Sequence, residues 1–285
     1  MITDRETNTV YLSERLKSDK RFSKTCQDII DILKACQVDY GFLPNTRDIW
    51  ARDYMPVQVS EEKFIEFRYD PDYLQGEENR IKKTYPDIVC DAIGLKTTKS
   101  DIVIDGGNVI KSNDAVILTD KILIENEGIY QLDQLINELK GLFEVEKIIL
   151  IPWDEKNDYF GHADGMIRFI DEKKVLLQSY FDKYSRKFKD KLFNTLKANS
   201  IEWIKLEYSV PKEDYLRNWA YINFLQTKDL IIVPKLGIDE DEQAFFQIKT
   251  IFADYAERER VFQVDMSSVV EESGALNCIS WTTKQ

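Results

Sequence analysis

The sequence predicts an α/β fold in which five strand–strand–helix–strand units close into a ring. One observation behind this prediction is that the same order of elements recurs along the chain. Another is the spacing of the hairpins that open the units, which begin near Met55, Asn108, Met166, Tyr221 and Leu276, 53 to 58 residues apart. Such a period is typical of repeat proteins, and a ring leaves no terminal unit uncapped. The alternative is a generic α/β domain whose strands are spaced by chance.

Four of the units follow one another along the chain. Each opens with a hairpin, in which two apolar runs flank a short polar turn. Each continues with a helix, in which apolar residues recur every three or four positions, and ends with a short apolar strand. In chain order, the hairpin, helix and last strand are predicted at 55–69, 79–94 and 101–105; 108–120, 129–143 and 147–153; 166–180, 184–200 and 201–208; and 221–237, 239–260 and 261–266.

The fifth unit is assembled from the two ends of the chain. Residues 275–283 supply a hairpin strand, 24–37 the helix and 38–44 the last strand. No linker-like or low-complexity segment interrupts the sequence, so residues 1–285 are expected to form one domain. Joining both termini in one unit would fasten the ring, and one end of every unit would then converge on a central mouth.

The charge and composition of the chain limit its partners and its location. It has 39 Lys and Arg against 51 Asp and Glu, a formal net charge of −12, which disfavours nucleic acid and favours neutral or cationic partners. One histidine and four cysteines without a CxxC pair argue against a zinc site, and no metal or organic cofactor is predicted. No apolar run approaches the roughly 20 residues that span a bilayer, and the N-terminus lacks the apolar core of a signal peptide. A cytoplasmic protein that binds no membrane is expected.

Residues capable of chemistry lie at the start of the hairpins. Asp53, Asp105 and the pair His162 and Asp164 come just before three of them, and Cys278 lies just inside the fifth. A ring would gather these side chains around its axis. A cysteine near a histidine can form a thiolate nucleophile, with the imidazole as general acid and base, whereas several carboxylates in one pocket require a cation. A guanidinium fits this need, because it is planar, permanently charged and offers five N–H donors.

At these residues the sequence resembles the agmatine deiminase and bacterial peptidyl-arginine deiminase family, within the guanidino-group-modifying pentein superfamily. The matching motifs, in order along nearly the whole chain, are NTRDIWARDYMP, DGGN, GHADGMIRF, AYINF and SGALNCISWTTKQ. The resemblance implies the pentein fold, which is a five-bladed α/β propeller. It also implies these roles: Cys278 as nucleophile, His162 as general acid and base, Asp105 at the catalytic acid position, Asp53 and Asp164 as guanidinium carboxylates, Trp50 as pocket wall, and Asn223 near the site.

The reaction that the resemblance implies is hydrolysis of a guanidino group to a ureido group plus ammonia, with agmatine giving N-carbamoylputrescine. The alternatives are an arginine or peptidyl-arginine deiminase, an amidinotransferase that forms the same covalent intermediate, and, last, a pentein that only binds partners. A homodimer is also expected from the family. An α-carboxylate on the substrate would need an arginine partner such as Arg52, Arg168 or Arg217.

The sequence also departs from the family at several positions. Asp105 stands where glutamate is usual, and amidinotransferase relatives use aspartate there, which favours transfer. Tyr54-Met55 replaces a small residue and a glycine, Asn277 replaces a histidine, and the glycine run before the cysteine is reduced to Ser273-Gly274. These changes bear on pocket shape and substrate, and they leave the nucleophile, the acid/base and the guanidinium carboxylates in place.

Each candidate residue also has a plain structural interpretation, in which it serves packing or local geometry. These interpretations are a buried small hydrophobe for Cys278, a turn residue for His162, a carboxylate paired with Arg52 for Asp53, a core residue for Trp50 and a backbone-bonded strand residue for Asn223. The adjacent Gly106 and Gly107 are expected to serve turn geometry rather than phosphate binding, since no GxGxxG or Walker pattern accompanies them.

Overall fold

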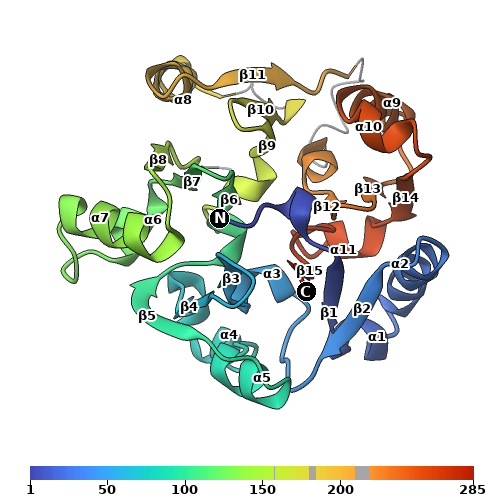
Figure 1. Ribbon diagram of the computed structural model, residues 1–285, viewed down its shortest axis with the longest axis horizontal. Coiled ribbons are helices and arrows are strands. Elements are labelled where there is room, and N and C mark those ends of the chain that lie inside the picture. Colours follow the sequence, from blue (N-terminus) through green and yellow to red (C-terminus); the bar gives the residue numbers. More distant parts are fainter. Residues whose placement is uncertain (157, 180–183, 209–217) are drawn as a thin grey trace.

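Five three-stranded sheets surround a common centre in the computed structural model, which describes residues 1–156, 158–179, 184–208 and 218–285 (Figure 1). In each sheet the first strand pairs antiparallel with the middle strand, and the middle strand pairs parallel with the third. Parallel neighbours require a crossover connection, which a helix usually supplies. The predicted ring of five strand–strand–helix–strand units, the pentein propeller, is confirmed.

Each unit contributes one sheet of the ring. Listed sheet by sheet from the first strand to the third, the strands are β3 (Val57–Gln58), β4 (Phe64–Arg68) and β5 (Thr98–Val103); β6 (Ile110–Lys111), β7 (Ala115–Thr119) and β8 (Lys147–Ile151); β9 (Ile167–Asp171), β10 (Lys174–Leu177) and β11 (Glu202–Lys205); β12 (Leu225–Gln226), β13 (Ile231–Lys235) and β14 (Val261–Asp265); and β15 (Ser280–Thr283), β1 (Thr9–Ser13) and β2 (Asp39–Leu43).

The longer helices lie around the outside of the ring (Figure 1). The helix α7 shows why, because Leu135, Leu139 and Phe143 recur every four residues and are buried, so one apolar stripe packs on the sheet while the polar face meets solvent. The helices, in chain order, are α1 (Glu14–Ser18), α2 (Ser23–Ala35), α3 (Ala51–Tyr54), α4 (Glu77–Arg80), α5 (Pro86–Ala92), α6 (Lys121–Glu125), α7 (Leu132–Phe143), α8 (Arg186–Ala198), α9 (Glu240–Ile251), α10 (Ala253–Ala256) and α11 (Ser267–Val270).

Both termini meet in one sheet, as predicted. The strand β15 pairs antiparallel with β1, with Thr283 opposite Thr9 and Ser280 opposite Leu12, and β1 pairs parallel with β2. The prediction did not identify β1 as the middle strand. It also placed the first strand at 275–283, whereas residues 276–279 form a buried turn before β15. This turn is apolar because it packs into the centre of the ring, and its apolar run therefore imitates a strand.

Several other predicted boundaries are wrong. The helix expected at 79–94 is two short helices, α4 and α5, and α5 begins at Pro86, which is favoured at a first helical position. The helix expected at 239–260 breaks at Phe252, whose backbone (φ −108°, ψ 55°) leaves the helical region between α9 and α10. The helix expected from residue 129 begins at Leu132, after the separate short helix α6.

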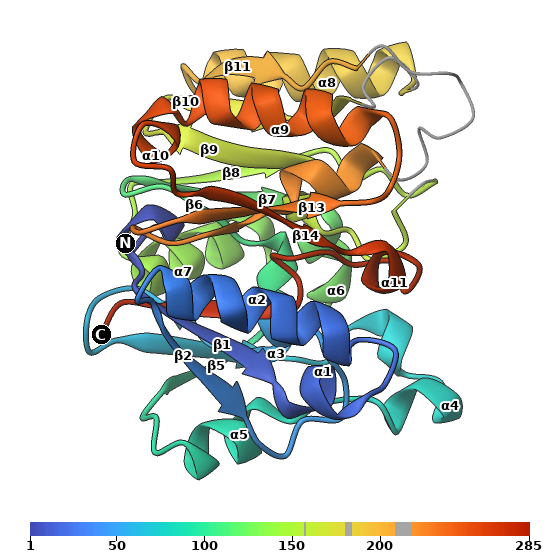
Figure 2. The same ribbon diagram turned by 90° about the vertical axis from the view of Figure 1, so that its right-hand side faces the viewer.

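Seen from the side, the ring has two distinct ends. Both termini lie at one end, which is named the terminal end, and α1, α4 and α11 lie at the other, which is named the helical end (Figure 2). Across the described residues, none of the helices is both long and apolar enough to cross a membrane.

Candidate active site

Short turns surround the axis of the ring where the hairpins begin. Four are helical, namely α3, η3 (Gly106–Asn108), η4 (Ala163–Gly165) and η6 (Asn218–Ile222), and the fifth is the turn at 276–279. The first four pack against one another in chain order around the axis, and α3 also packs against β15. The predicted site residues lie in or beside these turns, so residues that are far apart in the sequence meet at the centre.

A cavity of about 550 Å³ opens at the helical end of the axis. Trp50, Asp53, His162 and Cys278 are four of its lining residues, and its volume lies in the range of small-molecule sites. Trp50 is half-buried and also packs on the apolar core, so it serves both as pocket wall and as core residue. A Cβ atom at Gly274 would collide with the Trp50 ring, which explains a glycine at that position.

His162 is held by carboxylates on two sides. Its Nε2 lies 2.9 Å from Asp105 Oδ2, and its Nδ1 lies 3.7 Å from Asp53 Oδ1. Burial by itself disfavours the imidazolium, but the charges of Asp53, Asp105 and Asp164 outweigh burial and raise the pKa of His162 to about 10. The histidine therefore carries a proton at neutral pH in the empty site.

Asp53 is buried at the bottom of the cavity, where its Oδ1 accepts a hydrogen bond of 3.2 Å from the backbone N–H of Gly107. Burial, reinforced by the charges of Asp105 and Asp164, raises the pKa of Asp53 well above its usual value. A Cβ at Gly107 would lie 2.7 Å from both Asp53 Oδ1 and His162 Nδ1. Gly107 is therefore required, because a side chain there would collide with Asp53 and His162. Gly106 and Gly107 open the turn η3, and the sequence predicted that this pair of glycines serves turn geometry.

Cys278 is 5 % exposed and lies beside the polar side chains of two other units. Its thiol donates to Asn223 Oδ1 at 3.3 Å and to Asp164 Oδ2 at 3.6 Å. Burial, together with the charges of Asp164 and Asp53, raises the pKa of the Cys278 thiol well above its usual value. Burial and these carboxylates therefore favour the neutral thiol over the thiolate.

Asn223 and Asn277 hold the turn that carries the cysteine. Asn223 Oδ1 accepts hydrogen bonds from the backbone N–H groups of Asn277 (3.0 Å) and Cys278 (3.2 Å), and its side chain is fully buried. Asn277 Nδ2 donates to Asp164 Oδ2 at 2.7 Å. Asn223, predicted near the substrate, lies beside Cys278 and, like Asp105 and Asp164, is not among the residues that line the cavity.

Two residues that contact the site were not predicted. Tyr73 lines the cavity and donates from its hydroxyl to Asp105 Oδ2 at 2.6 Å, so it shares that oxygen with His162. Asn277 was noted only as a departure from the family pattern. Tyr73 lies in the short turn η2 (Asp72–Leu74) between β4 and α4, where no periodic pattern could have pointed to it.

Lys121 lies directly behind the site and is 1 % exposed. Its Nζ is 2.9 Å from Asp72 Oδ1 and 3.3 Å from Glu125 Oε1, and it donates to the carbonyl of Phe160 at 3.0 Å. Burial raises the pKa of Glu125 to about 7. The lysine therefore ties the segment that bears Tyr73 to the loop that bears His162.

The arginines proposed for a substrate carboxylate lie elsewhere. Arg52 and Arg168 face the terminal end of the axis, where both approach Asp4, and Arg217 falls outside the described residues. The interpretation of Asp53 as a carboxylate paired with Arg52 is not supported, because the ion pair of Arg52 is with Asp4, at 3.8 Å. In the described ranges, no group of three or more potential metal ligands comes together.

A ring of five such units with a cysteine, a histidine and three carboxylates at its axis defines a guanidine-modifying pentein. The sequence profile of the Porphyromonas-type peptidyl-arginine deiminase family matches residues 1–283. The chain belongs to this family and is a hydrolase that acts on the C–N bonds of guanidino groups.

Solved structures agree with this fold. The C. jejuni agmatine deiminase superposes with a TM-score of 0.77 at 16 % identity, over 100 % of this chain and 95 % of that one. The Enterococcus faecalis agmatine deiminase gives 0.71 at 18 % identity, over 100 % and 95 %. DDAH from Pseudomonas aeruginosa gives 0.57 at 14 % identity, over 97 % and 99 %. No curated protein sequence matches the chain.

Proposed function

We propose that agmatine is the substrate of this guanidino-group hydrolase and that the products are N-carbamoylputrescine and ammonia. The observation that carries the proposal is the charge of the buried site, where Asp53 and Asp105 lie against one cation, His162, and the charge of the buried Asp164 also acts on it. A bound guanidinium supplies the missing positive charge. Its N–H groups suit two carboxylates, because each carboxylate can accept two parallel hydrogen bonds.

The positive charge of the bound guanidinium also activates the nucleophile. A guanidinium between Asp53 and Asp164 would lie beside Cys278 and favour the thiolate, which burial and these carboxylates otherwise disfavour. The thiol proton is released to solvent when the cation binds, because His162 already carries a proton. The thiolate then attacks the central carbon of the guanidinium. Cationic substrate and anionic nucleophile thus neutralise each other in a place from which water is largely excluded.

His162 moves the protons of both half-reactions. It gives its proton to the departing nitrogen, the C–N bond breaks, ammonia leaves, and an S-alkylthiouronium group remains on Cys278. The neutral imidazole then takes a proton from water, whose oxygen attacks the same carbon. The C–S bond breaks, and the oxygen loses its second proton to solvent, where ammonia takes it up as ammonium. These steps give the ureido product and restore the thiolate and the protonated His162. Asp105 orients the imidazole through the bond to Nε2.

Two features support agmatine, which lacks a carboxylate. Arg52 and Arg168 do not line the cavity. Asp48 lies on the cavity wall, and burial raises its pKa to about 7. A substrate ammonium near Asp48 would favour the ionised carboxylate and gain an ion pair in a half-buried place.

One observation favours arginine or a peptidyl-arginine as a second candidate. Arg15, Arg47 and Lys82 line the mouth of the cavity, and all three are exposed. A fourth cation there, Arg21, is paired with Asp19 and Glu272 at 2.7 and 2.6 Å. An α-carboxylate or a peptide carbonyl at the mouth could contact the first three.

A panel of guanidines tests the proposal. Agmatine, arginine and a blocked arginyl peptide are each incubated with the protein, and ammonia and ureido product are measured. We expect the highest kcat/KM for agmatine and ammonia release without any added amine. Product that forms only when an acceptor amine is present would identify an amidinotransferase, and preference for arginine would favour the second candidate. The absence of turnover across the panel would contradict hydrolysis.

A further inference from the structure

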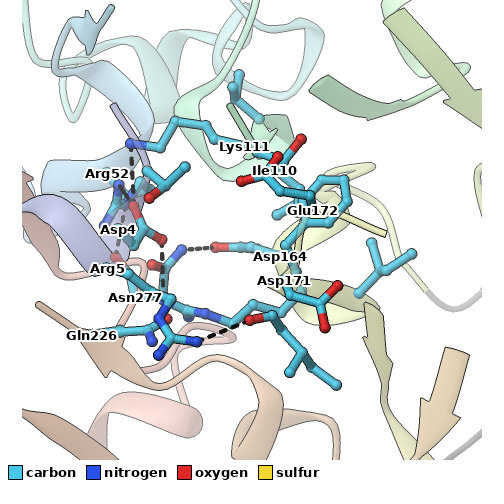
Figure 3. Close-up of a pocket in the computed structure, with 17 residues that line it drawn as sticks. Asp4, Arg5, Arg52, Ile110, Lys111, Asp164, Asp171, Glu172, Gln226 and Asn277 are labelled. Atoms are coloured by element: carbon cyan, nitrogen blue, oxygen red, sulfur yellow. Dashed lines mark hydrogen bonds and ion pairs between the residues drawn. The ribbon is translucent and has the colours of Figure 1, made fainter. Parts of the chain in front are cut away.

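A second cavity, of about 60 Å³, opens at the terminal end of the axis (Figure 3). Its walls come from the N-terminal turn η1 (Asp4–Glu6), from β6 and from β9. Its inner wall includes Asn277 and Asp164, which are joined by a hydrogen bond at the centre of the view. One water needs about 10–15 Å³ of such a cavity, so several waters or one small ion would fit.

Three buried cations surround this cavity. The side chains of Lys111 and Arg168 are each 7 % exposed, and that of Arg52 is 10 % exposed. Each approaches the carboxylate of Asp4, with nitrogen–oxygen distances of 3.2 Å for Lys111, 3.0 Å for Arg168 and 3.8 Å for Arg52. In the part of the chain that the structure describes, Asp4 is the one carboxylate within ion-pair distance of any of the three.

The charges of this cationic cluster, which comprises Asp4, Arg52, Lys111 and Arg168, do not balance. Three positive charges face two buried carboxylates, Asp4 and Asp164, and Asp164 on the inner wall already accepts from Asn277 and contacts Cys278, so at least one positive charge is left without a partner. Glu172 and Asp171 are exposed at the rim, where water screens them. Burial lowers the pKa of Lys111 and also lowers that of Arg168, to about 10, which is the expected response of cations short of partners.

One donor of the cluster has no hydrogen-bond partner. Arg168 donates from Nη2 to Asp4 and from Nη1 to the carbonyl of Phe224, but among the described residues its buried Nε finds no acceptor. A buried donor without a partner costs free energy. An additional acceptor with negative charge would satisfy both the donor and the excess charge.

We propose that the cationic cluster binds a small inorganic anion, such as chloride or bromide, in the cavity at the terminal end of the axis. Arg52, Lys111 and Arg168 would then contact both the anion and the carboxylate of Asp4. Cys278 and His162 do not line this cavity, whereas Asp164 does, so Asp164 lies between the anion site and the proposed guanidinium site. The anion proposal does not depend on the substrate or reaction of the other end.

The anion site adjoins the active site through two short connections. Arg52 Nε donates to the carbonyl of Asn277 at 3.4 Å, and the backbone N–H of Arg52 donates to the carbonyl of Cys278 at 3.0 Å. An anion that fixes Arg52 therefore also stabilises the turn that carries the nucleophile. We expect anion binding to stabilise the folded ring as a whole.

Thermal unfolding tests the proposal without any activity measurement. Melting is followed in sodium chloride, sodium bromide and sodium gluconate at equal ionic strength, because gluconate is too large for the cavity. A ligand that binds only the folded state raises Tm, and at about 100 times Kd we expect chloride or bromide to raise it by about 5 °C over gluconate.

Two variants should change this response in opposite directions. Lys111→Met removes a cation and should reduce the chloride-dependent rise in Tm by more than half, whereas Asp4→Asn removes the competing carboxylate and should enlarge it. Lys147→Met, an exposed lysine on β8, is the matched control and should respond as the wild type does. If Lys111→Met does not fold, the chloride-dependent rise in Tm of Asp4→Asn still tests the proposal, because it should exceed that of the wild type.

Crystals grown in sodium bromide give a direct test. Anomalous scattering should show a bromide peak between Arg52, Lys111 and Arg168. The proposal is overturned if no peak lies there, or if the wild type, Lys111→Met and Asp4→Asn respond equally to chloride.

Discussion

The two ends of the ring axis carry opposite charge patterns built from the same turns. At the helical end Asp53 and Asp105 lie against His162, and at the terminal end three cations surround Asp4. Arg52 and Asp53 are consecutive residues of α3 but serve opposite ends, because successive residues of a helix do not face the same way. Asp164 lies between the two ends, since it contacts Cys278 and also lines the terminal cavity, where its charge favours the cationic form of Arg168. An acidic layer (Asp53, Asp105 and Asp164) and a basic layer (Arg52, Lys111 and Arg168) therefore lie back to back at the axis.

The largest expected effect comes from the nucleophile at the helical end. Cys278→Ala should lower kcat for the best guanidine by about 10⁴-fold or more, because no covalent intermediate can form. Cys36→Ala, which removes a buried thiol far from the axis, should leave kcat nearly unchanged. Equal activity of Cys278→Ala and the wild type would refute the mechanism.

Lys121→Met tests the support that lies behind the acidic layer. The change leaves Glu125 buried without its cation and frees the segments that bear Tyr73 and His162. We expect a loss of about 3–5 kcal/mol in the free energy of unfolding, measured by urea denaturation. Lys147→Met should cost less than about 0.5 kcal/mol. Restoration of kcat, but not of stability, by Lys121→Arg would identify the lysine as a positioning residue.

Asp53→Asn tests the guanidinium carboxylate while keeping the shape of the side chain. Loss of a buried charge partner for the substrate should lower kcat/KM by about 10²–10³-fold, since such a pair contributes about 3–5 kcal/mol. The exposed Asp101→Asn serves as the control. An unchanged kcat/KM in Asp53→Asn would show that the guanidinium binds elsewhere.

The proton on His162 gives a stability that depends on pH. The pKa of His162 in the folded protein is raised to about 10, above the ordinary value of 6.5. The contribution of this proton to the free energy of unfolding is therefore complete below pH about 6.5 and is lost as the pH rises through about 10. Between pH 7 and 10, the free energy of unfolding of the wild type should fall relative to that of His162→Gln, by at most about 1.4 kcal/mol per pH unit. Parallel curves would contradict the assignment.

The smallest effect on catalysis is expected from the basic layer. Lys111→Met should change kcat/KM by less than about fivefold, because one charge beyond the wall contributes on the order of 1 kcal/mol at the reacting atoms. The same variant should change the response of Tm to chloride clearly. A loss of kcat/KM as large as that of Asp53→Asn would show that the two layers are not functionally distinct.

The acidic layer could be predicted from the sequence, and the basic layer could not. Asp53, Asp105, His162 and Asp164 stand at equivalent places before successive hairpins, so the period of the repeat predicts that they meet. Asp4 lies in a short N-terminal turn outside any repeat, and its partner Arg168 is 164 residues away. No local pattern encodes such a contact, because it depends on how the closed ring brings the N-terminal turn over β6 and β9.

The lack of a local sequence pattern also explains which elements of the fold the sequence did not predict. The strand β1 is five residues long and lies directly before α1, so neither length nor spacing separates it from its surroundings. The turn at 276–279 is buried, and periodicity alone cannot distinguish a buried turn from a strand. The hairpins, whose patterns are local, lie within a few residues of their predicted positions, whereas the long helix expected at 239–260 is interrupted at Phe252.

The closure of the ring by β1 and β15 has a consequence for synthesis of the protein. A chain is made from its N-terminus, and domains begin to fold while it emerges. The strand β15 and the turn that carries Cys278 follow every other strand of the described ring in the sequence, so they leave the ribosome after the strands with which they pair and pack. A nascent chain that has not yet reached residue 276 therefore lacks both the cysteine and the strand that closes the ring.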